Sequence, residues 1–389
     1  MIPRIAPRMN DIAPFHVMEL VARAKQLETA GHDIIHLEVG EPDFKTAAPI
    51  INAAQRFLAQ GEVKYTPALG LPELRQAIAD FYQNHFGVTV AAERIVVTAG
   101  ASGALQLALG VLVAPGDEWL QPDPGYPCNR HFVRVFEGVP KLLPVGPESQ
   151  FQPTAAQIAA AWTGNTRGIM LASPSNPTGT VLDPAELERI IHQVHAAAGN
   201  IIVDEIYQGL TYGAAPFTAL SISDDVFVVN SFSKYFGMTG WRLGWLVAPT
   251  AYLRSIEKLA QNLFICAPTV SQHAALAAFT PETLAEFERR REEFSQRRDV
   301  LLNGLSELGL RVPASPQGAF YAYADISTWG GDSFNLAQQL LEKLGIAATP
   351  GIDFGKHRAA DHMRFAYTTT QDKITEALAR LRQWRITLT

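Results

Sequence analysis

Short apolar runs alternate with helical patterns from residue 46 to about residue 280. Residues 72–87 repeat apolar positions at helical spacing and stop at Gly87, which predicts a helix. Between such segments lie short runs rich in Val, Ile and Leu, each closed by a polar or small residue, as is typical of buried parallel strands. These runs are residues 94–98, 168–173, 200–205, 226–230 and 242–248. The alternation predicts an α/β fold in which helices wrap a mostly parallel sheet.

The pattern changes after residue 280. Residues 281–309 form one long, highly charged amphipathic pattern that is capped by Thr280 and ends at Gly309. Two strand patterns, a helix pattern between them and a final helix follow, at 318–326, 335–345, 362–367 and the C-terminus. We therefore predict a large domain over 46–285 and a smaller α+β domain formed by 1–45 and 286–389.

Composition and charge exclude several classes of protein. The chain has 389 residues, of which 47% are hydrophobic and 18% charged, as in an ordinary globular enzyme, and its net charge of −6 gives no reason to expect nucleic acid as a partner. Its two cysteines form no C-x-x-C pair, which argues against a disulfide framework and a thiolate metal site. The apolar stretch 104–115 is too short to span a membrane, and the first twenty residues lack the apolar core of a secretory signal. We expect a cytoplasmic protein that contacts neither membrane nor nucleic acid.

Lys234 follows the apolar run 226–230, and this position raises the question of whether it takes part in catalysis. Most lysines only face solvent, so this is the starting interpretation. Ser231 and Lys234 also fit the S-x-x-K of penicillin-binding enzymes, but the K-T-G that should accompany it is absent. The chain has no G-x-S-x-G, G-x-G-x-x-G or complete P-loop either, and the pair His192 and His195 has no third ligand nearby, so no metal site is predicted. A lysine that forms a Schiff base with a carbonyl cofactor remains.

Pyridoxal phosphate, as such a cofactor, would need a carboxylate for its ring nitrogen, donors for its hydroxyl and an aromatic face. Asp204 closes the run 200–205, where an acidic side chain is costly unless paired, although it could also simply cap a strand. Tyr207 and Asn176 could both reach the ring hydroxyl. Tyr126 is a candidate for stacking on the ring, although such a tyrosine is more often part of the core or its rim.

The cofactor's phosphate would need an anion site, and the sequence offers two segments for it. The stretch 98–110 runs from a strand end through glycines into a helix, whose N-terminus would present the backbone N–H groups of Ala101 and Ser102. The segment after 226–230 adds hydroxyl donors and a guanidinium that fits a phosphate in a bidentate manner, from Ser231, Ser233 and Arg242. Together these features favour a pyridoxal phosphate site.

A series of motifs covers nearly the whole chain in order: "VGEPDF" at 39–44, "KYTPALGLPELRQAIA" at 64–79, "TAGASGAL" at 98–105, "PDPGYP" at 122–127, "SPSNPTGT" at 173–180, "VDEIYQGLTY" at 203–212, "SFSKYFGMTGWRLGW" at 231–245, "QGAFY" at 317–321 and "MRFAY" at 363–367. The series resembles the class I/II aminotransferases, pyridoxal-phosphate enzymes of fold type I. The resemblance implies that Lys234 forms the Schiff base and moves the proton, and that Asp204 pairs with the ring nitrogen. It also implies cofactor contacts by Asn176 and Tyr207 at the ring hydroxyl, by Tyr126 at the ring face, and by Ala101, Ser102, Ser231, Ser233 and Arg242 at the phosphate.

The resemblance also implies how substrate binds and how the chain assembles. Arg364 would bind the α-carboxylate, with Gly40 and Asn176 near the same group; a planar guanidinium suits that role. The family works as a homodimer with its active site at the interface, where Tyr65 would reach the partner's phosphate.

Substrate identity is less constrained. A similar aspartate-preferring subgroup carries lysine at the position of Ser102, so aromatic or neutral L-amino acids are favoured and aspartate stays possible. Phe15, Ile12 and Tyr321 are candidate pocket walls. The expected reaction is ping-pong transfer to a 2-oxo acid such as 2-oxoglutarate. The alternatives are a carbon–sulfur β-lyase on the same scaffold, and a non-catalytic cofactor-binding regulator, which would need a fused DNA-binding module.

Overall fold

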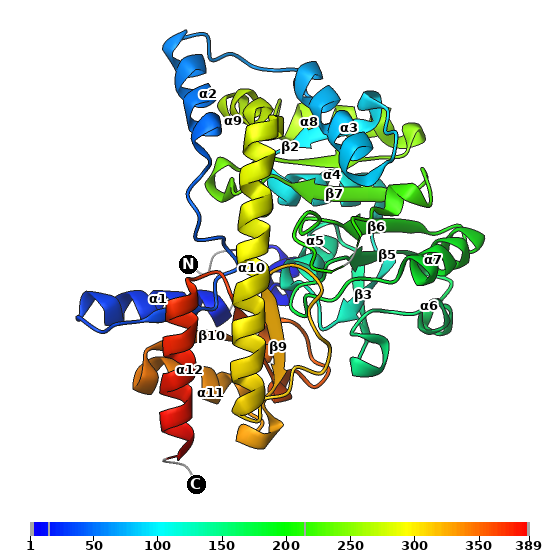
Figure 1. Ribbon diagram of the computed structural model, residues 1–389. Coiled ribbons are helices and arrows are strands. Elements are labelled where there is room, and N and C mark those ends of the chain that lie inside the picture. Colours follow the sequence, from blue (N-terminus) through cyan, green and yellow to red (C-terminus); the bar gives the residue numbers. More distant parts are fainter. Residues whose placement is uncertain (1–3, 15, 214, 387–389) are drawn as a thin grey trace.

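A seven-stranded sheet forms the centre of the protein (Figure 1). The computed structural model describes residues 4–14, 16–213 and 215–386. The strand order is β2-β8-β7-β6-β5-β3-β4, and all strands are mutually parallel except β8, which is antiparallel to both neighbours. The strands are β2 (Ile95–Thr98), β3 (Glu118–Asp123), β4 (Val139–Pro144), β5 (Thr166–Ala172), β6 (Asn200–Asp204), β7 (Phe227–Ser231) and β8 (Gly244–Val247). This confirms the predicted α/β fold with a mostly parallel sheet.

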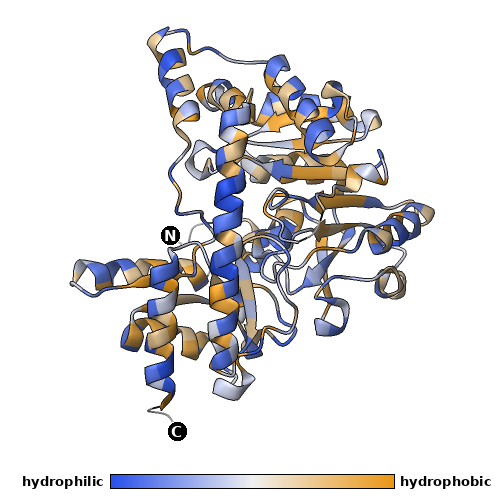
Figure 2. Cartoon of the chain, in the orientation of Figure 1, coloured by the Kyte–Doolittle hydropathy of each residue, from blue (hydrophilic) through white to orange (hydrophobic). Residues whose placement is uncertain are grey.

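Apolar residues cover both faces of this sheet because successive side chains of a strand point to opposite sides. On β6 and β7, Ile201 and Val228 join one apolar cluster, whereas Ile202 and Val229 join the other. The central strands accordingly stand out as hydrophobic in Figure 2. The helices that pack around the sheet are α3 (Pro72–Phe86), α4 (Gly100–Leu112), α5 (Pro127–Val135), α6 (Ala155–Ala161), α7 (Pro184–Ala196) and α8 (Leu253–Leu263), while α2 (Ala48–Ala59) packs against α9 (Thr269–Ala275).

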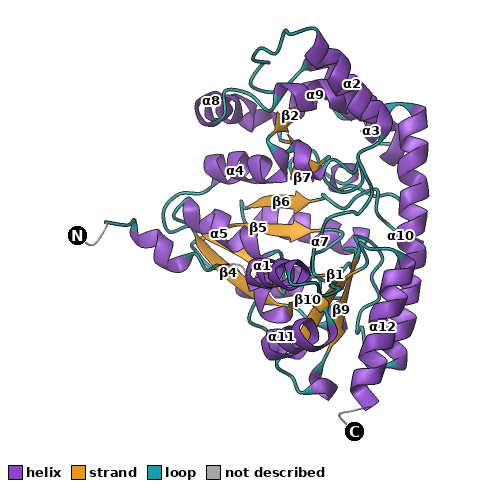
Figure 3. Cartoon of the chain, turned by 90° about the vertical axis from the view of Figure 1, so that its left-hand side faces the viewer, coloured by secondary structure: helices purple, strands orange, loops and turns teal. Residues whose placement is uncertain are grey.

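A second sheet of four strands joins the two ends of the chain. Its order is β1-β10-β11-β9, formed by β1 (Ile35–Leu37), β10 (Ile346–Pro350), β11 (His362–Ala366) and β9 (Tyr321–Asp325). Strand β1 pairs in parallel with β10, so the N-terminal segment is hydrogen-bonded to C-terminal strands. Helices α1 (His16–Thr29), α11 (Ser333–Leu344) and α12 (Gln371–Ile386) belong to the same region of the molecule (Figure 3). The domain boundaries given above stay a prediction.

One long helix, α10 (Pro281–Glu307), runs past both sheets (Figures 1 and 3). Its start is capped as expected, since the Thr280 side chain accepts a hydrogen bond from the Thr283 N–H. No helix in the described ranges is both long enough and apolar enough to cross a membrane.

Strands β3 and β4 are absent from the sequence-based prediction. Pro122 interrupts β3, while Pro140 and Pro144 lie in β4, which is an edge strand and therefore tolerates missing N–H donors. The predicted strand 242–248 was also too long, because β8 begins only at Gly244.

Candidate active site

Polar side chains gather at the carboxyl edge of the central sheet. Strands β2, β3, β5, β6 and β7 all point the same way, so the residues that follow them meet at one edge, where ligands bind in open α/β sheets. A cavity of about 410 Å³ opens there. It brings together thirteen of the residues singled out in the sequence: Gly40, Ala101, Ser102, Tyr126, Asn176, Asp204, Tyr207, Ser231, Ser233, Lys234, Arg242, Tyr321 and Arg364.

Lys234 lies just beyond the end of β7 and turns into this cavity. Its Nζ donates a hydrogen bond to the Gly40 carbonyl at 2.6 Å. Burial lowers the pKa of Lys234 to about 8, although Glu41 acts in the opposite direction, and Arg364 lowers it further. At neutral pH a useful fraction of the amine is therefore unprotonated and able to act as a nucleophile.

Asp204 is the last residue of β6 and is 6% exposed. Its Oδ1 accepts a hydrogen bond from the Ile206 N–H at 3.0 Å, and burial raises the pKa of the carboxyl to about 6. Within the described ranges no side-chain cation forms an ion pair with this carboxylate. A buried anion without a cation fits the protonated ring nitrogen of pyridoxal phosphate, which would supply the missing donor.

The start of α4 faces the cavity with backbone N–H groups that no helical carbonyl can satisfy. Gly100 begins the helix at φ 72°, a conformation that favours glycine. Gly244 of β8 lies directly against this turn: a Cβ there would come within 2.7 Å of the Gly100 carbonyl carbon and 2.8 Å of the Ala101 nitrogen. The bare backbone of β8 thus holds the N-terminus of α4 at the cavity.

Two hydroxyls and a guanidinium complete the predicted anion site. The Ser231 hydroxyl donates to the Ser233 hydroxyl at 2.9 Å, and the Ser233 N–H donates to the Ser231 hydroxyl at 3.0 Å. Arg242 adopts φ 53° and places its guanidinium beside Gly100. Positive charge, hydroxyls and a helix N-terminus together suit a phosphate group.

Arg364 of β11 provides a second candidate anion site in the cavity, and it is 5% exposed. Its Nη1 donates to Asn176 Oδ1 at 2.8 Å, and its Nη2 donates to the Glu38 carbonyl at 2.5 Å and to Thr349 Oγ1 at 3.2 Å. The guanidinium carbon lies 4.2 Å from the centre of the Tyr321 ring. These contacts fix the plane of a cation that suits a carboxylate.

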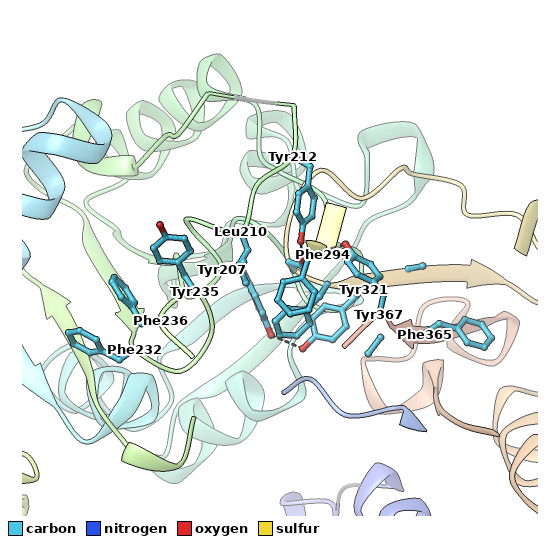
Figure 4. Packing of buried hydrophobic residues seen from close by; sticks show 14 of the residues in the cluster. Tyr207, Leu210, Tyr212, Phe232, Tyr235, Phe236, Phe294, Tyr321, Phe365 and Tyr367 are labelled. Carbon is cyan, nitrogen blue, oxygen red and sulfur yellow. Dashed lines mark hydrogen bonds between the residues drawn. The ribbon is translucent and has the colours of Figure 1, made fainter. Parts of the chain in front are cut away.

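Two tyrosines link the sheets across the cavity. The hydroxyls of Tyr207 and Tyr321 are 2.7 Å apart, and the rings meet edge to face (Figure 4). Gly40 packs against the same pair, since a Cβ there would lie 2.0 Å from the Tyr321 hydroxyl oxygen. The backbone at residue 40 can therefore approach both Lys234 and Tyr321 only because it carries no side chain.

Some expected site residues do not join the cavity. Tyr65 is 79% exposed and does not line this chain's own cavity. Ile12 is not part of the cavity wall, so the sequence-based expectation for it was wrong, and Phe15 lies outside the described residues. Helix α1 contributes Val17, Met18 and Val21 to the wall instead. The i, i+4 spacing of the two valines indicates one apolar helix face, but not what that face meets.

Comparison with known proteins agrees with this geometry. Residues 32–381 match the sequence profile of the family described as aminotransferase class I and II. A valine–pyruvate aminotransferase of Mycobacterium tuberculosis is 40% identical over 386 residues, with 99% of each chain covered. A (5-formylfuran-3-yl)methyl phosphate transaminase of Methanocaldococcus jannaschii is 35% identical, with 98% of this chain and 99% of the relative covered. The crystal structure of an aminotransferase from Mycobacterium tuberculosis superposes with a TM-score of 0.96 at 40% identity, covering 99% of this chain and 100% of that one.

The family match spans most of the chain, and the residues at the sheet edge suit the cofactor that this family uses. The chain belongs to the class I and II aminotransferases, enzymes that transfer amino groups with the aid of pyridoxal phosphate.

Proposed function

We propose that this aminotransferase takes the amino group from a neutral or aromatic L-amino acid and passes it to a 2-oxo acid such as pyruvate or 2-oxoglutarate, in two half-reactions at one site. The observation that carries the proposal is the position of Lys234: a buried amine in one cavity with the unpaired carboxylate of Asp204 and the guanidinium of Arg364.

Each residue has a separate task in this scheme. Arg364 binds the α-carboxylate of the substrate and fixes the orientation of its Cα–H bond. Lys234 Nζ takes the proton from Cα and returns it later in the transfer. Asp204 would keep the cofactor's ring nitrogen protonated, and pyridoxal phosphate, when bound, would supply the electron sink that makes the Cα proton acidic. Asn176 and Tyr207 would donate to the ring hydroxyl, and Tyr126 would lie against the ring face.

The remaining tasks concern the phosphate. Ser231, Ser233, Arg242 and the first turn of α4, which includes Ala101 and Ser102, would bind it. Because these groups anchor one end of the cofactor while Arg364 anchors the substrate, the reacting atoms between them are held in a fixed relation.

The walls of the cavity favour an apolar substrate side chain. Val17, Met18 and Val21 of α1 form one wall, and Leu105 contributes from α4. Within the described part of the chain, the cations of the cavity are Lys234, Arg242 and Arg364, and each already has a task. A second carboxylate would therefore meet no cation from this chain, which disfavours aspartate. The similar protein from Mycobacterium tuberculosis is named for valine and pyruvate, in line with this choice.

Visible absorption of the holoenzyme tests the reaction and the substrate class together. Single amino acids are added one at a time, and the change from the cofactor's aldehyde form to its amine form is followed. We expect valine and phenylalanine to convert the spectrum at least about tenfold faster than aspartate at equal concentration, because a charged group left unpaired in an apolar pocket is rejected by that margin or more. Pyruvate or 2-oxoglutarate should then restore the first spectrum.

D-valine serves as the control in that experiment, because its α-hydrogen cannot point at Lys234 when its carboxylate is on Arg364. A faster reaction with aspartate would refute the substrate class. Release of pyruvate and ammonia from cystathionine without any oxo acid would instead establish the β-lyase.

We also propose that the enzyme is a homodimer. An exposed apolar surface on α2 and the segment after it, formed by Ile51, Leu58, Val63 and Tyr65, would be covered by the second copy, as would Leu263 and Ile265 at the end of α8. Such a group of exposed large apolar side chains marks an interaction site. Tyr65 would then donate to the phosphate in the partner's cavity.

Mixing two inactive variants tests this assembly. In a mixed dimer of Lys234→Ala and Tyr65→Ala, one site has an intact lysine and receives the intact tyrosine of the other chain. We expect the mixture, after subunit exchange, to recover activity toward the level of one wild-type site per dimer, whereas each variant alone stays low. No recovery in a mixture shown by mass to contain mixed dimers would contradict a Tyr65 that acts across the interface.

A further inference from the structure

Glu38 is a fully buried acidic residue that the proposed reaction does not use. It directly follows β1, and its Oε1 lies 2.7 Å from Nδ1 of His36. Its Oε2 is buried and has no hydrogen-bond partner among the described residues. An ionisable group held in this way is costly, and so calls for a physical explanation.

The main chain of Glu38 touches the substrate-binding arginine. The sheet register aligns Leu37 with Ala348 and Thr349 with Arg364, so the end of β1 lies in one row with β10 and β11. In that row the Glu38 carbonyl accepts hydrogen bonds from Arg364 Nη2 at 2.5 Å and from Thr349 Oγ1 at 3.1 Å. Any shift of the backbone at residue 38 would therefore rotate the guanidinium or leave one of its N–H groups unpaired.

His36 connects the Glu38 side chain to helix α1. Its Nε2 lies 3.1 Å from Oε1 of Glu28, which also pairs with Lys25 on the same helix. The hydrogen bond to Glu38 is the main reason why the pKa of His36 rises to about 9, and Glu28 adds to the effect. The ring is therefore an imidazolium at neutral pH and donates from both nitrogens, to a carboxylate on each side.

We propose that Glu38 is a positioning residue for substrate binding: its carboxylate, locked by His36 and through His36 to α1, fixes the carbonyl that orients Arg364 toward the substrate α-carboxylate. The inference rests on the proposed role of Arg364. If Glu38 has this role, the N-terminal segment, including helix α1 that lines the cavity, influences how tightly the carboxylate of every substrate is bound.

Steady-state kinetics of the holoenzyme with Glu38→Gln and with His36→Gln tests the proposal. Both variants should raise KM for the amino acid and for the 2-oxo acid by roughly tenfold, the effect of losing one well-placed hydrogen bond to a charged group. The value of kcat should stay within about threefold, because the lost interaction is equally present in ground and transition states.

Glu342→Gln is the matched control. It removes a different tie of α1, the ion pair between Arg23 and Glu342, without touching Glu38. Its KM values should stay within about twofold of wild type, because sites without shared contacts act independently.

Proton NMR titration of the histidines supplies a readout that a merely structural role would not move. The protein has ten histidines, and the resonance missing from His36→Gln identifies His36. It should titrate near pH 9 in the wild type and about two units lower in Glu38→Gln, as expected when a carboxylate partner is lost. Saturation with 4-methylpentanoate, a carboxylate without an amino group, should shift the wild-type titration, since coupling between sites is reciprocal.

Unchanged KM values in both variants, with the His36 titration lowered in Glu38→Gln, would overturn the proposal. If Glu38→Gln does not fold, the KM of His36→Gln tests the positioning role by itself, because His36 is only half-buried. Arg364→Lys distinguishes failure of the proposed function from failure of the positioning role. If Arg364→Lys leaves KM unchanged, the proposed role of Arg364 is refuted. If Arg364→Lys raises KM but the Glu38 and His36 variants do not, only the positioning role of Glu38 is refuted.

Discussion

Replacement of Lys234 by alanine is expected to slow amino transfer by about 10⁴-fold or more, since it removes the amine that we propose to move the Cα proton and to attack the cofactor's aldehyde. The structure offers no substitute, because no other lysine lines the cavity among the described residues. Water is a poor replacement as well, since the amine lies in a buried position fixed by the Gly40 carbonyl.

The measurement is a coupled assay of the oxo acid released from valine, together with the cofactor content of the desalted protein. The variant should still hold pyridoxal phosphate, because Ser231, Ser233 and Arg242, which are proposed to bind its phosphate, remain in place. Added methylamine should restore part of the rate by acting as a diffusible base. Turnover within tenfold of wild type would contradict the assignment of Lys234.

Replacement of Asp204 by alanine should lower kcat by about 10²–10³-fold, the size of effect seen when one preorganised electrostatic contact to developing charge is removed. Asp204 is ionised above about pH 6 and is buried, so its interaction with a ring N–H is weakly screened by water. Without this carboxylate, the ring nitrogen of the bound cofactor would lose its proton and would accept charge poorly. Asp204→Asn, which keeps the shape but not the charge, should fall almost as far.

Glu205→Gln is the matched control for Asp204. Glu205 is the next residue along the chain and equally buried, but its carboxylate accepts from Thr218 Oγ1 and the Ala219 N–H, away from the cavity. Burial raises the pKa of Glu205 to about 8, so glutamine resembles the protonated form that prevails at neutral pH. Its kcat should stay within about threefold, as independent sites predict. Equal losses at both positions would show that packing, and not charge, explains the effect at Asp204.

The candidate active-site residues at the ends of the parallel strands could be predicted from the sequence. Asp204 and Lys234 each close an apolar run, and parallel strands must bring such positions to one edge. The four-strand sheet could not be predicted in the same way. Arg364 and Asn176 meet at 2.8 Å although 188 residues separate them, and no local pattern encodes a contact that depends on how two sheets pack.

Strands β3 and β4, and the part of the cavity wall that α1 forms, were also not predicted from the sequence. The apolar-run criterion rejects β3 and β4, whose prolines interrupt the run. The valines of α1 carry a helical pattern, but the pattern says only that they face something apolar, not that they face a substrate.

The pairing of β1 with β10 also sets an order of assembly during synthesis. All seven strands of the central sheet have been made once residue 247 has emerged, so the edge that carries Asp204 and Lys234 can form on an unfinished chain. Glu38 must wait for Thr349, 311 residues later, before its carbonyl finds its partners. A chain that ended between these two points would contain the residues proposed to bind the cofactor's phosphate but would lack Arg364, the residue proposed to bind the substrate.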